Sequence, residues 1–349
     1  MMPLEKRTLG HTKVSVTSAG LGTVPLSGFN VGVPYSEFEA VVKAAFDLGV
    51  RYFDCAPMYG LGKAEHFLGR ALRDLRIRDQ VVVSTKCGRV LKPASRTPKL
   101  DTVYGIEWVD PYPFRDTYDY TYDGVMRSFE DSQQRLGLDY VDVLLVHDVG
   151  RAWHGDQAEY YWNQLRESGY RALDALKSSG AIGAVGLGVN ETESVVGVAR
   201  EFPIDCALIA GRYTLLNHAP LDGHFDELQS RNVSVIAGGI YNSGILAAGS
   251  KAVASTYDYQ QVPSAILERV RSVEKVCERH GVDLPTVATQ FVQAHPAVAT
   301  VVQGAKSTSE VTQNVHAVSA RIPAALWQDL RNFNLIPSNA PVPEDGRSS

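Results

Sequence analysis

The chain has 349 residues, of which 44% are hydrophobic and 21% charged, so it can bury a large core and is not a disordered protein. Its formal net charge of −5 and its lack of a Lys/Arg run argue against nucleic-acid or membrane partners, and no apolar run has the length of a membrane span. Four scattered cysteines, without zinc or disulfide spacing, predict reduced thiols in a cytoplasmic protein that binds no metal.

A strand, loop and helix unit recurs along the chain after a short hairpin predicted at residues 7–18. Apolar runs of strand length lie at 19–22, 52–54, 81–86, 141–147, 184–188, 206–210, 234–238 and 300–302. Helical periodicity lies at 37–48, 64–72, 122–136, 160–179, 193–201, 221–231, 264–279 and 310–317. Eight such units predict an α/β fold, a (β/α)8 TIM barrel formed by one domain at residues 1–336, with a loose tail at 337–349.

A doubly wound sheet that binds a dinucleotide is the competing architecture. Its fingerprint, GxGxxG, follows the first strand and opens a helix. The glycine-containing segments at 20–25 and 60–65 both lack the third glycine. No shift in composition divides the chain either, so a single barrel is favoured.

Two connections, at residues 89–120 and 241–262, exceed ordinary loop lengths. They follow the third and seventh predicted strands, so in a barrel both lie on the C-terminal face, where the pocket is built. The first contains Trp108, Tyr112, Phe114 and Tyr118. Exposed aromatic side chains there suit stacking on a sugar or ring substrate, and a lid that packs on itself explains them equally well.

Ionisable side chains end three successive predicted strands. Asp54 ends the second, Lys86 the third and His147 the fourth, and Tyr59 lies on the loop that Pro57 begins. Each has a simpler explanation on its own: a helix cap, a surface lysine or a buried polar histidine. A barrel, however, makes strand ends neighbours, so we expect these residues to meet at its mouth.

The chemistry available to this group is general acid/base catalysis. A tyrosine, whose intrinsic pKa is about 10, becomes useful near neutrality when a cation lies beside its hydroxyl. Lys86 can supply that charge and depress the pKa of Tyr59, and Asp54 can hold Lys86 as an ion pair. His147 can fix the substrate oxygen that exchanges its proton with Tyr59. The sequence shows no metal cluster, no nucleophile paired with a base and no P-loop as an alternative. Acid/base chemistry on a hydroxyl or carbonyl group is what remains.

These residues lie in segments that resemble the aldo-keto reductase superfamily. The segments are 53–72, 84–86 and 136–147, and the likeness extends from Gly20 to Asn314. The resemblance implies a (β/α)8 barrel that binds a nicotinamide cofactor at its C-terminal face. It also implies a catalytic tetrad in which Tyr59 is the proton donor or acceptor and the other members are Asp54, Lys86 and His147.

The resemblance further implies a set of cofactor-binding residues. Asn190 matches the residue that holds the nicotinamide carboxamide; the others are Gly22, Thr23, Gly304, Lys306, Glu310 and Asn314. The chain departs from the family pattern by having Val189 where a serine is usual, Ala210 where a glutamine is common and Gly238 where a tyrosine commonly stacks on the nicotinamide. These departures remove expected cofactor contacts and leave the tetrad intact.

Glu310 lies where relatives that prefer NADPH often have an arginine for the 2′-phosphate. A carboxylate there repels that phosphate and can accept a hydrogen bond from a ribose hydroxyl, which predicts NAD rather than NADP. Lys306 argues the other way, because it can hold a phosphate.

Within the superfamily, the segments 114–128, 146–148 and 208–217 are similar to the sugar-oxidising branch of aldose 1-dehydrogenases, L-galactose dehydrogenase and pyridoxal 4-dehydrogenase. The resulting hypothesis is an NAD-dependent dehydrogenase that oxidises the anomeric C1 hydroxyl of an aldose to a lactone. Its substrate is a small molecule, and the oligomeric state stays open. The alternatives are oxidation of pyridoxal, NADPH-dependent carbonyl reduction, and a cofactor-sensing binding subunit with little turnover.

Overall fold

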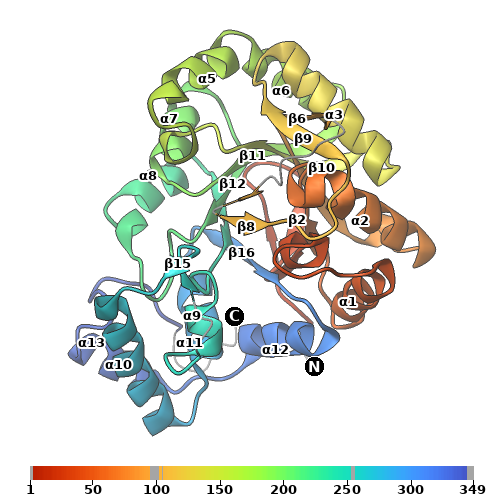
Figure 1. Ribbon diagram of the computed structural model, residues 1–349. Helices are drawn as coiled ribbons and strands as arrows, with labels where there is room; N and C mark the ends of the chain where they lie inside the picture. The colour runs from red at the N-terminus through yellow and green to blue at the C-terminus, as the bar shows by residue number, and fades with distance from the viewer. Residues whose placement is uncertain (1–2, 95–101, 104, 253–255, 344–349) are drawn as a thin grey trace.

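Eight parallel strands close into a barrel in this computed structural model, which describes residues 3–94, 102–103, 105–252 and 256–343. In barrel order the strands are β10 (Val141–His147), β11 (Ile182–Val189), β12 (Cys206–Ala210), β13 (Ser234–Gly238), β16 (Val298–Gly304), β3 (Ala19–Gly22), β4 (Tyr52–Asp54) and β5 (Val82–Cys87). Helices surround them (Figure 1). The predicted TIM barrel is confirmed, and each predicted strand falls on one of these eight.

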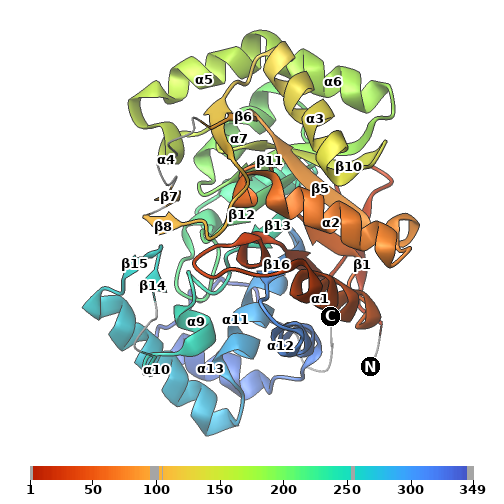
Figure 2. The ribbon, with the colours of Figure 1, turned by 45° about the vertical axis from the view of Figure 1, so that its right-hand side comes forward.

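The helical layer closes in the same way as the strands. The helices are α1 (Tyr35–Asp47), α2 (Lys63–Asp74), α3 (Tyr122–Leu136), α4 (Arg151–His154), α5 (Ala158–Gln164), α6 (Tyr170–Ser178), α7 (Glu193–Glu201), α8 (His224–Ser230), α9 (Ile245–Ala248), α10 (Ser264–His280), α11 (Leu284–Gln293), α12 (Thr308–Ser319) and α13 (Ala324–Asn332). Because α12 packs against both α1 and α11, the ends of the chain meet in one ring (Figure 2). Among the described residues, no helix has both the length and the apolar composition needed to cross a membrane.

Several helical features differ from the prediction. The helix predicted at 160–179 is interrupted by a π-helical turn, Leu165–Gly169, between α5 and α6. Helices α4, α9, α11 and α13 were not predicted. Helix α11 is buried along its whole length, so it lacks the polar face by which a helix is recognised.

The predicted hairpin is confirmed as β1 (Lys6–Thr8) paired with β2 (Ser15–Thr17). Leu9, Val14 and Val16 are buried and pack with side chains of the barrel interior, such as Val143 and Leu145. The hairpin therefore closes the N-terminal end of the barrel, opposite the strand ends that carry the ionisable residues.

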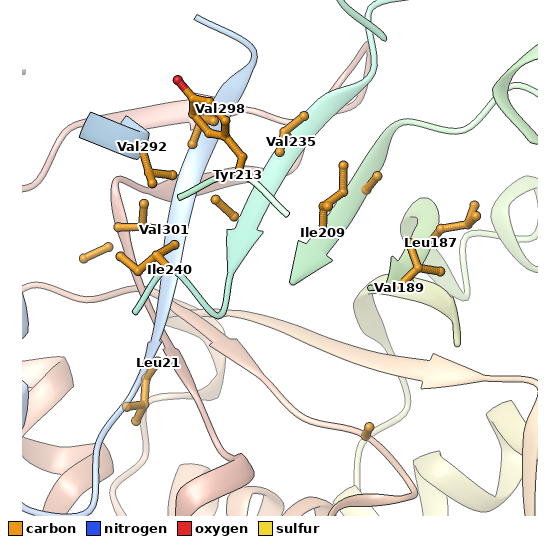
Figure 3. Packing of buried hydrophobic residues seen from close by; sticks show 14 of the residues in the cluster. Leu21, Leu187, Val189, Ile209, Tyr213, Val235, Ile240, Val292, Val298 and Val301 are labelled. Atoms are coloured by element: carbon orange, nitrogen blue, oxygen red, sulfur yellow. The ribbon is translucent and has the colours of Figure 1, made fainter. Parts of the chain in front are cut away.

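Successive side chains of β10 point alternately into two different apolar layers. Val143 and Leu145 point into the barrel, while Leu144 and Val146 pack against the helices. Figure 3 shows part of this outer layer, including Ile209 on β12 and Val235 on β13. With both faces buried, the strands are almost continuously apolar, which is why their positions were predictable.

Both long connections carry small sheets on the C-terminal side. The first forms β6 (Arg89–Pro93) paired with β9 (Phe114–Tyr118), and β7 (Thr102–Val103) paired with β8 (Ile106–Glu107). The second contains α9 and the pair β14 (Thr256–Tyr257) and β15 (Gln260–Gln261). Residues 95–101, 104 and 253–255 of these connections lie outside the described residues.

The predicted tail begins beyond α13. Within it Ala340 is buried, and its carbonyl accepts a hydrogen bond from Arg331 Nη2 at 2.8 Å. Residues 344–349 lie outside the described part of the chain, so the division into a barrel domain and a loose tail stays a prediction.

Candidate active site

Neighbouring strands bring the predicted tetrad together at the C-terminal mouth of the barrel. Asp54 ends β4, Lys86 lies near the end of β5, and His147 ends β10; these strands are adjacent in the barrel. Tyr59 begins a 3-10 turn, Tyr59–Gly62, directly after β4. The four side chains come from three consecutive strands and one loop, as the strand-end pattern predicts.

The ammonium group of Lys86 is the centre of the site. It donates to Asp54 Oδ2 at 2.8 Å, to Tyr59 Oη at 2.9 Å and to the Cys55 carbonyl at 2.9 Å, so all three of its hydrogens have acceptors. The Lys86 and Asp54 side chains are only 1% and 4% exposed. Burial acts to lower the pKa of Lys86, but Asp54 and Tyr59 outweigh it and raise that pKa, so the lysine is charged.

Asp54 is held by residues that were not predicted as site residues. Its Oδ1 accepts from Ser84 Oγ at 2.7 Å, and Ser84 Oγ also lies 2.9 Å from Tyr52 Oη. Its carbonyl accepts from both the backbone N–H and the hydroxyl of Thr23. The signal for Tyr52 and Ser84 was available, because alternation places both on the same face of the barrel as Asp54 and Lys86.

Two glycines make this geometry possible. Gly60 has φ +61°, and a Cβ there would lie 2.4 Å from the Ser27 carbonyl oxygen, so only glycine fits where the Tyr59 turn meets the first loop. On β11, a Cβ at Gly188 would lie 3.0 Å from Cε of Lys86. Gly188 thus leaves room for the lysine stem inside the barrel.

The Tyr59 hydroxyl is buried, and burial changes the pKa expected for it. Burial raises the pKa of Tyr59, while the nearby Lys86 charge lowers it and only partly offsets burial. The sequence argument predicted a depressed pKa; the lysine acts in that direction, but the net shift is upward because the hydroxyl is desolvated. Tyr59 is therefore a neutral phenol that hydrogen-bonds to an ammonium group.

His147 is neutral and faces Tyr59 edge-on, with 6.1 Å between ring centroids. Burial, followed by the charges of Arg89 and Lys86, holds the pKa of His147 well below its ordinary value. Its Nδ1 is buried without a hydrogen-bond partner, and Nε2 lies 3.4 Å from Asp148 Oδ2. A buried N–H without an acceptor is costly, so the proton belongs on Nε2, which makes this atom a donor.

A buried charge cluster adjoins His147 and was missed in the sequence. Arg89 is 2% exposed and bonds Asp148 through Nη2 and Asp116 through Nη1, each at 2.5 Å. Its guanidinium lies 4.9 Å from the Tyr118 ring centroid and 4.3 Å from that of Trp153. Its members come from two parts of the chain, the β6–β9 pair and the segment after β10, so only the position of Asp148 directly after His147 signalled it.

Above the tetrad, the two long connections meet the loop between β3 and α1. Phe29 contacts Trp108 and Tyr259, at centroid distances of 5.2 and 5.9 Å, and Trp108 lies 6.4 Å from Tyr59. Trp108 is 3% exposed, so the expectation of an exposed aromatic is wrong for this residue. It packs against its neighbours, as the alternative of a lid predicted.

The predicted cofactor residues surround the same mouth. Gly22 and Gly304 are paired in neighbouring strands, β3 and β16. Asn190 follows β11, donates from Nδ2 to the Ala210 carbonyl at 3.3 Å, and accepts from Arg212 Nε at its own carbonyl at 2.6 Å. Thr23 is fully buried and uses both of its donors on Asp54, so here it positions the tetrad, and its direct cofactor contact stays a prediction.

At the start of α12, Glu310 has a structural role that the sequence reading missed. Ser307 caps the helix by accepting from the Glu310 N–H at 3.2 Å, and the Glu310 carboxylate accepts from the Lys306 N–H at 2.8 Å. This pattern resembles a capping box, except that Glu310 bonds the N–H of Lys306, the residue before the cap, instead of that of Ser307. Asn314 donates from Nδ2 to the Gly304 carbonyl at 3.2 Å.

The residues present fit a nicotinamide dinucleotide. Asn190 offers an amide in a cavity that Asp148 also lines, so an amide lies next to the tetrad. The capped N-terminus of α12, with Lys306 beside it, suits the anionic or hydroxylated end of such a molecule. Ala210 and Gly238 supply no polar side chain there, and their carbonyls already accept hydrogen bonds from Asn190 Nδ2 and the Gly211 N–H.

Comparison with known proteins identifies the family of the chain. The model of the aldo/keto reductase family matches residues 19–334. The chain is 42% identical over 340 residues to pyridoxal 4-dehydrogenase from Microbacterium luteolum, covering 95% of this chain and 98% of that protein. It is 34% identical over 340 residues to D-threo-aldose 1-dehydrogenase from a Pseudomonas species, covering 95% of this chain and 100% of that protein.

Among solved structures, the holo form of an aldo-keto reductase from Bacillus halodurans superposes with a TM-score of 0.74 at 22% identity, covering 99% of both chains. At that identity the likeness shows a shared fold. The family model covers most of the chain, including all four predicted catalytic residues. The chain belongs to the aldo/keto reductase family.

Proposed function

We propose that this protein is an NAD-dependent dehydrogenase that oxidises the hydroxyl of a cyclic hemiacetal to a lactone. The observation that supports this most strongly is the contact of the buried Lys86 ammonium with Tyr59 Oη at 2.9 Å. That contact places a fixed positive charge beside the hydroxyl that must gain and lose a proton.

In this proposal the substrate hydroxyl lies between Tyr59 Oη and His147 Nε2. Tyr59 as phenolate takes the hydroxyl proton, the Lys86 charge stabilises that phenolate, and Asp54 keeps Lys86 in place. His147, neutral and protonated on Nε2, donates to the substrate oxygen and orients it. A bound nicotinamide supplies the acceptor for the hydride from the hemiacetal carbon. Because Tyr59 is a neutral phenol at rest, oxidation requires that its proton leave first, so turnover should rise with pH.

Two substrate classes share the required chemistry. The anomeric carbon of an aldose and the hemiacetal carbon of pyridoxal both carry a hydroxyl and a ring oxygen, so loss of hydride and proton gives a lactone in either case. The chain is 42% identical to pyridoxal 4-dehydrogenase and 34% identical to D-threo-aldose 1-dehydrogenase. The higher identity supports pyridoxal as the first substrate to test. The relative named D-threo-aldose 1-dehydrogenase supports aldoses as the second.

The preference for NAD over NADP rests on Glu310. Its carboxylate lies at the N-terminus of α12, where it repels a 2′-phosphate, while Lys306 attracts one. The carboxylate accepts a hydrogen bond from the Lys306 N–H at 2.8 Å, and this fixes the negative charge in place.

The direct test is reduction of NAD+ and NADP+ with pyridoxal and a panel of aldoses. Tyr59→Phe should abolish turnover while the variant still binds NAD+ and unfolds at the temperature of the wild type. Tyr213→Phe is the matched control, because Tyr213 is also buried and its hydroxyl has no hydrogen-bond partner. Turnover by Tyr59→Phe at the rate of the control would refute the assignment.

One observation favours a second candidate function. A neutral Tyr59 is ready to donate a proton, which suits reduction of a carbonyl by NADPH. Rates in the two directions, measured with the same substrate pair, separate the two functions. A cofactor-sensing subunit would bind the dinucleotide and turn over none of these compounds.

A further inference from the structure

Asp148 is the strongest unexplained feature next to the tetrad. It follows His147 directly, has φ +52°, a left-handed conformation that is uncommon outside glycine, and buries its carboxylate. Its backbone N–H donates to the Gly188 carbonyl on β11 at 2.9 Å. The hydrogen bonding between β10 and β11 therefore continues to Asp148, and the chain turns away at this residue. Aspartate adopts this conformation more readily than most residues, so it is the buried carboxylate beside the active site, rather than the backbone, that suggests a functional role.

The surroundings of Asp148 favour ligands that donate hydrogen bonds. Arg89 is shared between two carboxylates, those of Asp148 and Asp116, so the cluster has one more negative than positive group. Asp148 also lines a small cavity whose other lining residues include Trp153, Val189, Asn190 and Glu191. Oε1 of Glu191 is buried without a hydrogen-bond partner. The free volume of about 10 Å³ has room for a single hydroxyl group or water, and two carboxylates and an indole ring line it.

The distances connect this cavity to the reaction. Asp148 Oδ2 lies 3.4 Å from His147 Nε2, the atom assigned to the reacting oxygen. A group one or two carbons from the reacting carbon can therefore reach the Asp148 carboxylate when the substrate is turned toward it. In an aldose that group is the O2 hydroxyl, and in pyridoxal it is the ring hydroxyl beside the hemiacetal.

We infer that Asp148 is a specificity-determining residue whose carboxylate accepts a hydrogen bond from a second hydroxyl of the substrate, next to the reacting carbon. This inference rests on the proposed site for the reacting oxygen. A substrate without that hydroxyl forgoes a hydrogen bond to a charged, buried carboxylate that Arg89 already holds, and this loss should separate hydroxylated substrates from their deoxy analogues by roughly 10- to 100-fold in kcat/KM.

The test compares Asp148→Asn with the wild type on matched substrate pairs. One pair is an aldose and its 2-deoxy analogue in oxidation, and the other is lactaldehyde and propionaldehyde in reduction, which differ only by the hydroxyl at C2. Asparagine keeps the shape and an oxygen for Arg89 but presents an amide of mixed polarity. We expect the preference for the hydroxylated member to fall to within about threefold in Asp148→Asn. Asp116→Asn, which changes the other carboxylate on Arg89, should keep the full preference.

Equal slowing of both members of a pair by Asp148→Asn would overturn the inference and leave Asp148 as support for His147. An increased KM for NAD+ with unchanged substrate preference would overturn it in favour of a cofactor contact. If the wild type oxidises no sugar or pyridoxal, the proposed function fails, and the aldehyde pair still tests Asp148. Without turnover of either pair, tryptophan fluorescence gives affinities, since Trp153 lines the cavity; equal binding of both members by the wild type would contradict the inference.

Discussion

Lys86→Met should destabilise the protein more than loss of an ordinary surface lysine does. The change removes the cation that contacts Asp54 Oδ2 at 2.8 Å and leaves a carboxylate that is 4% exposed without a partner of opposite charge. Breaking one side of a buried ion pair costs about 3–5 kcal/mol. With an unfolding entropy of about 0.7 kcal/mol/K for a chain of this size, this corresponds to a decrease in Tm of about 4–7 °C.

The decisive comparison is a double variant that combines Lys86→Met with Asp54→Asn. In the double variant neither charge is buried, and the amide introduced at position 54 can still accept from Ser84, so the Tm should lie above that of Lys86→Met alone. Thermal unfolding of the wild type, both single variants and the double variant gives the coupling energy between the two sites. If the double variant loses as much as the two single variants added together, the pair is not coupled and the reasoning is refuted. Both variants that lack Lys86 should be inactive. The second substitution should therefore restore part of the Tm and none of the activity.

Three further predictions concern protons, space and cofactor choice. Because burial raises the pKa of Tyr59 and lowers that of His147, the oxidation rate should rise as pH increases above about 7, and kcat profiles should show no inflection from His147 near its ordinary pKa. In Gly188→Ala, the new Cβ would lie 3.0 Å from Lys86 Cε, which should shift the ammonium and lower kcat about tenfold without changing NAD+ affinity, as steady-state kinetics would show. Glu310→Gln keeps an acceptor for the Lys306 N–H, so kcat/KM with NADP+ should rise about tenfold at constant Tm, whereas Glu310→Ala should also lower the Tm.

The barrel was predictable because of how its strands are buried. Each strand is covered by helices outside and by side chains inside, so it is an apolar run with turns at both ends. Helix α11 has the same composition for the same reason, and its threonines and valines gave it no helical pattern. The π-helical turn at Leu165–Gly169 likewise follows from packing and leaves the periodicity of its sequence unchanged.

The tetrad was predictable because strand ends converge in a barrel, whereas its support was not. Asp54 and Lys86 could be paired from their positions alone. Arg89 could not be assigned, because its partners lie 27 and 59 residues away along the chain and meet it only after folding. The pKa of Tyr59 was misjudged for a related reason: a sequence indicates a neighbouring charge, but it does not give the degree of burial.

The tetrad comes from β4, β5 and β10, whereas Asn190, Lys306 and Glu310 follow β11 and β16, in the rest of the ring, which begins at β11 beside β10. The departures from the family pattern, Val189, Ala210 and Gly238, lie on β11, β12 and β13 in the same arc. If the predicted cofactor contacts hold, we expect substitutions in this arc to change the choice of dinucleotide while the four tetrad side chains stay in place. An engineer would then vary this arc and leave Thr23 unchanged, because both of its donors hold Asp54.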